Sequence, residues 1–245
     1  MSWPLFFRQN RMFSYVVVLQ YTLETSMCFS ATASFTASGI IGLIGGRTIA
    51  KANSADRYLA YIPILFAIQQ SIEGIIWLGF SNPFFEDYRQ IATSFFLMFA
   101  WAIWPMYIPF AIAHGEKDER RESILKSLRI PGIIAGIGAI FPIFMSDPIP
   151  RIIDFHIDYF IQHDLYDQFV IQSYNVLYLL CTVVPMFISS RKGMTTYGLS
   201  NIFGLIIAGI FYESSVPSTW CFFSAIFSIM IYRIIAQSSE IPTEH

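Results

Sequence analysis

The chain has 245 residues, of which 55% are hydrophobic and 13% are charged, and its formal net charge at pH 7 is −2. Soluble domains carry roughly 25% charged residues, so this composition excludes an ordinary water-soluble globule and indicates an integral membrane protein surrounded by the lipid bilayer. The three cysteines, Cys28, Cys181 and Cys221, have neither CxxC nor zinc spacing, so they indicate no structural metal and no disulfide framework. We expect no cofactor and no nucleic-acid partner.

Seven stretches of the chain are long and apolar enough to form membrane-spanning helices. Such a helix needs about 20 apolar residues, because the hydrocarbon core offers no hydrogen bonds to an unpaired backbone. The sequence therefore predicts an all-α fold, a polytopic bundle of seven transmembrane helices in one domain at residues 27–236, followed by a tail at 237–245. The helices are expected near residues 30–50, 58–80, 90–113, 127–146, 168–189, 195–213 and 215–236.

Basic residues fall mainly in alternate connections of this bundle. One set of connections holds only Arg89 and Arg151. Eleven basic residues lie in or beside the other set: Arg47, Lys51, Arg57, Lys117, Arg120, Arg121, Lys126, Arg129, Arg191, Lys192 and Arg233. Because Lys and Arg are retained on the cytoplasmic side during insertion, we expect the bundle to have its N-terminus outside and its C-terminus inside.

The longest connection on the expected outer side, "DPIPRIIDFHIDYFIQHDLYDQ", carries two competing patterns. The stretch "DFHIDY" alternates like a β-strand, whereas apolar residues from Ile153 to Leu165 recur at helical spacing. We interpret the segment as an amphipathic helix on the outer surface. On such a helix His156, His163 and Asp167 would share one stripe, which is a weak candidate for a metal site beside the simpler interpretation of hydrated interfacial residues.

Residues 1–26 differ from the rest of the chain and allow three interpretations. Arg8 and Arg11, followed by "MFSYVVVLQYTL", resemble the start of a signal peptide, but no small-x-small cleavage site follows. The apolar part has about 12 residues, roughly 18 Å of helix, which is short for a span or anchor in a core of about 30 Å. The third interpretation is an extension that is not native, with translation starting at Met27.

Three motifs connect the remaining chain to a known group of proteins. "MCFSATASF" begins at Met27, "IQQSIEGIIWL" at Ile68 and "WAIWPMYIP" at Trp101. Together they resemble an uncharacterised family of mostly bacterial seven-helix membrane proteins whose members typically begin with Met-Cys-Phe-Ser, and the resemblance covers residues 27 to about 236. It implies a multi-pass protein of the cell membrane, the inner membrane of a bacterium, and it implies no particular activity.

Glu73 is the most informative residue of the sequence, because it is the only acidic residue well inside a predicted span. Placing an ionisable group at bilayer depth costs about 2.5–3.5 kcal/mol, so its presence needs a reason. Gln69 and Gln70 precede it by about one helical turn and Trp77 follows it by one turn, which puts all four on one helix face. With no Lys or Arg expected at this depth, desolvation favours the neutral form of the Glu73 carboxyl.

Polar residues of other predicted helices lie at a similar depth. The fifth helix carries Gln172 and Asn175 about 6–10 Å below the outer surface. The seventh begins with polar residues such as Ser218, and Cys28 lies at the outer interface ahead of the first helix. One interpretation is an outward-facing polar cavity that these residues line, with Glu73 near its floor. The other is hydrogen bonding between helices, at about 0.6 kcal/mol per contact.

Three kinds of function remain open. The first is binding or transport of a small ligand, a cation or a proton through the cavity around Glu73. The second is an intramembrane enzyme that uses Glu73 as an acid or base, for which no second catalytic group is apparent at equal depth. The third is a non-catalytic subunit of a membrane complex. We favour binding or transport, and we note that residues 215–236 contain no lysine for a retinal Schiff base.

Overall fold

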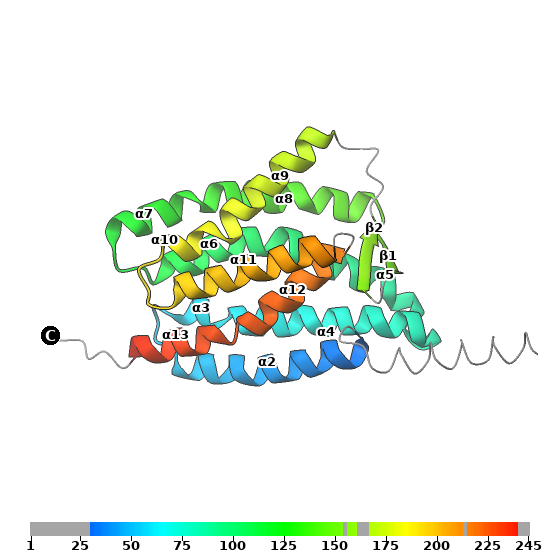
Figure 1. Ribbon diagram of the computed structural model, residues 1–245, viewed down its shortest axis with the longest axis horizontal. Coiled ribbons are helices and arrows are strands. Elements are labelled where there is room, and N and C mark those ends of the chain that lie inside the picture. The colour runs from blue at the N-terminus through cyan, green and yellow to red at the C-terminus, as the bar shows by residue number, and fades with distance from the viewer. Residues whose placement is uncertain (1–29, 154–155, 161–166, 213–214, 240–245) are drawn as a thin grey trace, which may run out of the picture.

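The computed structural model describes residues 30–153, 156–160, 167–212 and 215–239 of the chain. Its long helices run side by side along the long axis of the molecule, and a short β-hairpin lies at one end (Figure 1). In chain order the elements are α2 (Ala31–Lys51), α3 (Arg57–Ala60), α4 (Ile62–Ser81), α5 (Pro83–Leu97), the π-helix η1 (Met98–Ile103), α6 (Trp104–His114), α7 (Glu119–Ser127), α8 (Arg129–Met145), β1 (Ile149–Ile153), β2 (His156–Phe160), α9 (Gln168–Thr182), α10 (Val184–Ile188), α11 (Met194–Phe211), α12 (Val216–Phe227) and α13 (Met230–Ser239).

All seven stretches predicted to be helical are helical in the structure, and several are divided into shorter helices. The stretch near 90–113 consists of α5, η1 and α6, and the stretch near 215–236 consists of α12 and α13. Within the described residues, six helical stretches are long and apolar enough to cross a membrane. The exception is α2, whose first half carries hydroxyl residues between its apolar ones. The fold is therefore a helical bundle compatible with a multi-pass membrane protein, and the seventh crossing stays a prediction.

The two ends of the bundle carry different kinds of residue. We call one the hairpin end, since it carries β1, β2 and the start of α12. We call the other the basic end, which carries α7, α10 and the connections at residues 52–56, 115–118 and 189–193 (Figure 1). Lys117 and Arg191 are among the basic residues in these connections.

The connection expected to be an amphipathic helix contains the β-hairpin instead. β1 pairs antiparallel with β2, so that Pro150 lies opposite Tyr159 and Arg151 lies opposite Asp158. Ile157 and Tyr159 share one face of β2, and both are buried, with α12 as a neighbouring helix. The prediction of a helix is wrong for these residues, because strand alternation gives β2 one apolar face that packs on the bundle. Pro150 is tolerated in a hairpin because β1 is an edge strand.

Pro105 interrupts the third helical stretch and removes hydrogen bonds from the backbone. Proline has no N–H for the carbonyl four residues before it, which here belongs to Trp101. In the π-helix η1, the Trp104 N–H bonds to the Phe99 carbonyl, five residues before it. The carbonyl of Ala100, four residues before Trp104, therefore loses its α-helical partner as well.

Two tyrosines of α9 supply the missing hydrogen bonds. The Tyr174 hydroxyl donates to the Trp101 carbonyl and the Tyr178 hydroxyl donates to the Ala100 carbonyl, each over 2.6 Å. Within a bilayer an unpaired carbonyl costs several kcal/mol, so these two bonds stabilise the irregular turn and hold α9 against it. They also fix the position of Tyr178, which reappears below in the wall of a pocket.

Glycines allow α8 to approach the same irregular stretch closely. A Cβ added at Gly136 would lie 2.7 Å from the Ala102 carbonyl oxygen, and one added at Gly132 would collide with the Pro105 carbonyl. Membrane helices use small residues in this way to bring backbones together without a hydrophobic driving force. The chain segment that carries Trp104 is therefore enclosed by α8 on one side and by α9 on another.

Candidate functional site

Glu73 is buried within α4 together with the two glutamines that precede it. Gln69 and Gln70 are fully buried, and Glu73 is 2% exposed. The Ser218 hydroxyl donates a hydrogen bond to Glu73 Oε1 over 2.5 Å, and Gln70 Nε2 donates to Glu73 Oε2 over 3.3 Å. Two ion pairs occur among the described residues, and Glu73 belongs to neither. In the described part of the chain, the carboxyl thus has hydrogen-bond donors around it but no basic side chain paired with it.

The position of Ser218 follows from where α12 begins. The helix starts at Val216 and has Pro217 in its first turn, where the missing proline N–H costs no helical hydrogen bond. Ser218 lies in the same turn, so its bond to Glu73 brings the carboxyl to the N-terminus of α12. Free backbone N–H groups and a partial positive charge at a helix N-terminus favour negative charge. The contact that the structure shows between α12 and the carboxyl is the bond from the Ser218 hydroxyl.

Gln69 is held in place by the aromatic residues beside it. Trp104 Nε1 donates to Gln69 Oε1 over 2.8 Å, and the Trp104 ring stacks on Phe66 with ring centroids 4.0 Å apart. The other ends of the two amides are unsatisfied, because Gln69 Nε2 and Gln70 Oε1 are buried without a hydrogen-bond partner among the described residues. An unsatisfied buried polar atom costs about 1–3 kcal/mol. Two such atoms beside one carboxyl favour a site that a water molecule or an ion completes.

The hairpin contributes Tyr159 to the same place. Tyr159 is close enough to the Glu73 carboxyl for the two groups to interact electrostatically. Its ring stacks on Phe96, with centroids 4.9 Å apart and ring planes 20° apart. Its hydroxyl is buried and has no hydrogen bond of ordinary geometry to a described residue. We call Gln69, Gln70, Glu73, Tyr159 and Ser218 the Glu73 cluster.

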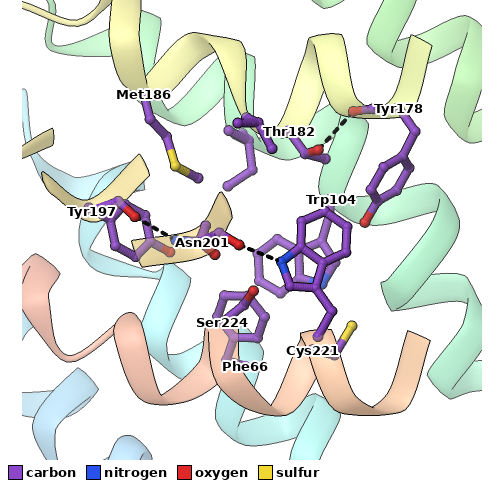
Figure 2. Close-up of a pocket in the computed structure, with 12 residues that line it drawn as sticks. Phe66, Trp104, Tyr178, Thr182, Met186, Tyr197, Asn201, Cys221 and Ser224 are labelled. Carbon is purple, nitrogen blue, oxygen red and sulfur yellow. Dashed lines mark hydrogen bonds between the residues drawn. The ribbon is translucent and has the colours of Figure 1, made fainter. Parts of the chain in front are cut away.

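A small pocket lies beside the Glu73 cluster and between several helices (Figure 2). Cys221 links the two, because it lines the pocket and also interacts with Gln69 and Glu73. The pocket contains about 30 Å³ in which the centre of a water molecule can lie. That is room for two or three water molecules, far below the roughly 300–1,000 Å³ of a site for an organic ligand. The pocket is lined by Phe66, Trp104, Ile108, Tyr178, Thr182, Val183, Met186, Tyr197, Asn201, Trp220, Cys221 and Ser224.

Hydrogen bonds fix one wall of this pocket. Asn201 Nδ2 donates to the Tyr197 carbonyl over 2.9 Å (Figure 2). Trp220 Nε1 donates to the Asn201 carbonyl over 3.1 Å. The Thr182 hydroxyl donates to the Tyr178 carbonyl over 2.8 Å. Every described residue that lines the pocket is uncharged. The wall therefore suits water better than a charged metabolite.

The structure does not bring every predicted cavity residue to Glu73. Gln172 and Asn175 are exposed, and their helix α9 packs on α6 and α8 rather than on α4, so the expectation that either approaches Glu73 is wrong. Trp77 is half-buried and packs against the hydrophobic cluster that contains Phe96. Cys28 lies outside the described residues. The physical reason is the rotation of α9 about its own axis. It directs Tyr174 and Tyr178 into the bundle and leaves the amide side chains of α9 exposed.

The weak metal candidates are also separated. His156 is buried on β2, and its ring centroid lies 4.2 Å from that of Tyr212. Asp167 is exposed and caps α9, where its Oδ1 accepts a hydrogen bond from the Phe169 N–H over 3.1 Å. His163 lies outside the described residues. Across the described ranges, no three His, Cys, Asp or Glu residues gather as a metal site would require.

Two residues that contact the glutamines or Glu73 were not expected from the sequence. Tyr159 was hidden by the helical interpretation of its segment, although the alternation in "DFHIDY" was a usable signal. Trp104 lies in the motif "WAIWPMYIP", but sequence spacing cannot show that its indole reaches Gln69 on another helix. Ser218 was expected only as part of the polar start of the last helical stretch.

Two further buried carboxylates, Asp56 and Glu116, lie at the basic end. Arg191 Nη2 forms an ion pair with Asp56 Oδ1 over 3.0 Å, and the two side chains are 8% and 6% exposed. Glu116 accepts hydrogen bonds at Oε2 from the Ser189 hydroxyl over 3.1 Å and from the Ser190 N–H over 2.8 Å. The Ser190 hydroxyl donates to its other oxygen. We call these five residues the basic-end cluster, and none of their buried side-chain nitrogen or oxygen atoms lacks a partner.

The charges of the basic-end cluster are stabilised by these contacts. Burial alone would raise the pKa of Glu116, but hydrogen bonds from Ser190, the Asp118 N–H and Ser189 together hold that pKa below its ordinary value. Burial lowers the pKa of Arg191, and the nearby carboxylates of Asp56 and Glu116 oppose this effect. The hydrogen bonds favour the charged form of Glu116, and the two carboxylates favour the charged form of Arg191.

Comparison with known proteins places the chain in a family. The sequence matches the family described as "Family of unknown function (DUF6629)" over residues 27–244. No curated protein and no solved structure matches the chain. The matched range includes every helix from α2 to α13, the hairpin, and all members of both clusters. Because the match covers most of its length, the protein belongs to this family of unknown function, DUF6629.

Proposed function

We propose that the protein is a multi-pass protein of a bacterial cell membrane that binds a proton or a small cation at the Glu73 cluster, as part of binding or transport across the bundle. The observation that carries this proposal is the buried Glu73 carboxyl, which has donors but no paired basic residue among the described residues. An isolated buried charge is costly, so the carboxyl needs either a proton or a cation.

The pocket supports a proton or a small ion over an organic ligand. It has room for only two or three water molecules, and its described lining is uncharged. Water there can satisfy polar atoms of the wall and can lead an ion or a proton toward Gln69 and Cys221. In this structure Glu73 is 2% exposed with Tyr159 beside it, so a path from the outside to the carboxyl, as the sequence predicts, would require these groups to move.

An intramembrane enzyme is less well supported. Cys221 is the only nucleophile of the described residues that interacts with both Gln69 and Glu73. A buried thiol beside a carboxylate has no cation to stabilise its thiolate, and the thiolate is the reactive form. Among the described residues, no histidine is found to interact with the Glu73 carboxyl and act as a base.

We propose seven crossings, with the basic end in the cytoplasm and the hairpin end outside. The distribution of basic residues between the two sets of connections supports this orientation. Reporter fusions at Lys117 and at Asp158 test it, and we expect cytoplasmic signal at Lys117 and external signal at Asp158. The same side for both fusions would contradict the proposed topology.

The proposed site is tested by infrared difference spectroscopy on the purified protein in lipid vesicles. We expect a band of a buried protonated carboxyl that changes with pH in the wild type and is missing in Glu73→Gln. Glu86→Gln is the matched control, because Glu86 is an exposed carboxylate of α5. Wild type and Glu73→Gln spectra that titrate identically would contradict a proton or cation site at Glu73.

A further inference from the structure

The Glu73 cluster gathers oxygen atoms from three elements around one negative charge. Glu73 provides two carboxylate oxygens and Gln70 an amide oxygen from α4, Ser218 a hydroxyl from α12, and Tyr159 a phenol from β2. The bonds of Ser218 and Gln70 to Glu73 show that these groups converge. Oxygen donors of this kind are the ligands that hard cations prefer.

Two of these oxygens are buried and incompletely bonded. Gln70 Oε1 has no hydrogen-bond partner among the described residues, and the Tyr159 hydroxyl has none there other than the Glu73 carboxyl beside it. Gln70 is fully buried and Tyr159 is 7% exposed, so bulk water does not satisfy either atom. The two ends of an amide have the same shape, so a half-turn of the Gln70 amide would bring Oε1 to the position of Nε2, 3.3 Å from Glu73 Oε2.

The charge of the occupant follows from its surroundings. The titratable groups that interact with the Glu73 carboxyl are Tyr159 from β2 and Cys221 from α12, and both are neutral in their ordinary forms. From α5, Arg89 is directed to the Gly79 carbonyl and the Phe80 ring, nearer the end of α4. From α2, the charged residues Arg47 and Lys51 lie in the final turns, at the basic end. One carboxylate without a paired base is neutralised by one positive charge, whereas divalent ions usually take several carboxylates.

We infer that Glu73, Gln70, Ser218 and Tyr159 form a binding site for a small monovalent cation such as Na⁺, which competes with a proton for the Glu73 carboxylate. This inference rests on the proposed function and names its ligand. Proton and Na⁺ are alternatives because either one alone makes the buried site neutral. Both together would leave a net positive charge in the buried site. Ser218 and Tyr159 bring together α12 and the hairpin, so binding of the cation would draw these elements to α4.

The test follows the protonated Glu73 band at a fixed pH where the band is half its maximum. NaCl replaces choline chloride at constant ionic strength, in vesicles that contain the full chain. We expect Na⁺ to decrease the band and choline to leave it unchanged, with KCl showing whether a larger ion fits. If pH changes the band and Na⁺ does not, the cation site is wrong while the proposed proton site survives. If neither changes it, both proposals are wrong.

Tyr159→Phe separates a ligand from a packing residue. The substitution keeps the ring that stacks on Phe96 and removes a hydroxyl that has no ordinary hydrogen bond to a described residue. We expect unchanged thermal stability without Na⁺ and an increase of about tenfold in the Na⁺ concentration that halves the band, the size expected when a charged group loses one polar contact. Ser218→Ala should raise that concentration as well. An unchanged Na⁺ response in both variants would overturn the proposed site.

Discussion

The Glu73 cluster and the basic-end cluster are both built around a buried glutamate that accepts hydrogen bonds from serine, yet they are completed differently. Glu116 accepts bonds from two serines and lies near Arg191, which is itself paired with Asp56. Glu73 has no such cation among the described residues, and Gln69 Nε2 and Gln70 Oε1 beside it are unsatisfied there. A satisfied polar network makes a structure rigid, whereas unsatisfied atoms around a lone charge are typical of a site that binds something.

The largest effect is expected when the ion pair of the basic-end cluster is broken. Arg191→Met leaves the buried Asp56 carboxylate without its partner, which typically costs 3–5 kcal/mol of unfolding free energy. Unfolding in detergent, followed by circular dichroism, measures the loss. Lys192→Met is the matched control, because Lys192 is the next residue in the chain and its side chain is exposed. A loss below about 1 kcal/mol for Arg191→Met would show that the pair is not structural.

The next effect concerns the space in which Arg191 lies. A Cβ added at Gly115 would collide with Arg191 Nη2 and with the Ala55 carbonyl oxygen. We expect Gly115→Ala to destabilise the protein by about 1–3 kcal/mol, the usual cost of overpacking. Gly46→Ala serves as the control, since nothing lies within 4 Å of a Cβ there and alanine favours a helix interior. Equal stability of the two variants would mean that the basic end rearranges easily.

Features that lie within a single helix could be predicted from the sequence. Helical spacing was enough to put Gln69, Gln70 and Glu73 on one face of α4, and hydropathy was enough to find the apolar helical stretches, but not the polar helix α7. Depth along a helix does not fix its rotation, so Gln172 and Asn175 were expected beside Glu73 but are exposed.

The basic-end cluster was missed for a related reason. Its members come from three connections that are far apart in the chain, and only the folded bundle brings Asp56, Glu116 and Arg191 together. The hairpin was missed because a short alternating run competes with helical spacing in the same segment. Patterns local to one element were readable, whereas contacts between elements required the structure.

A smaller effect on stability is expected at Glu73 itself. Glu73→Gln keeps the size of the side chain and an oxygen that can accept the Ser218 hydrogen bond, and it removes a buried ionisable group. We expect the unfolding free energy to change by no more than about 1 kcal/mol, in either direction. Thermal unfolding of the variant and the wild type at neutral pH measures the difference. A loss as large as that of Arg191→Met would put Glu73 in the same structural role as the basic-end cluster and would remove the contrast between the two.

The smallest effect is the acid sensitivity that Glu116 should give the basic end. Its pKa in the folded protein is below the ordinary value of 4.5, because hydrogen bonds from Ser190, Asp118 and Ser189 outweigh burial. A lowered carboxyl pKa contributes stability that is fully present above the unfolded-state value and is lost as pH falls through the folded-state value. Unfolding midpoints measured from pH 6 down to pH 3 should therefore fall more steeply below about pH 4.5 in the wild type than in Glu116→Gln. If the two proteins lose stability in parallel through this window, the hydrogen bonds to Glu116 do not stabilise its charge, and the basic-end cluster depends on Arg191 and Asp56 alone.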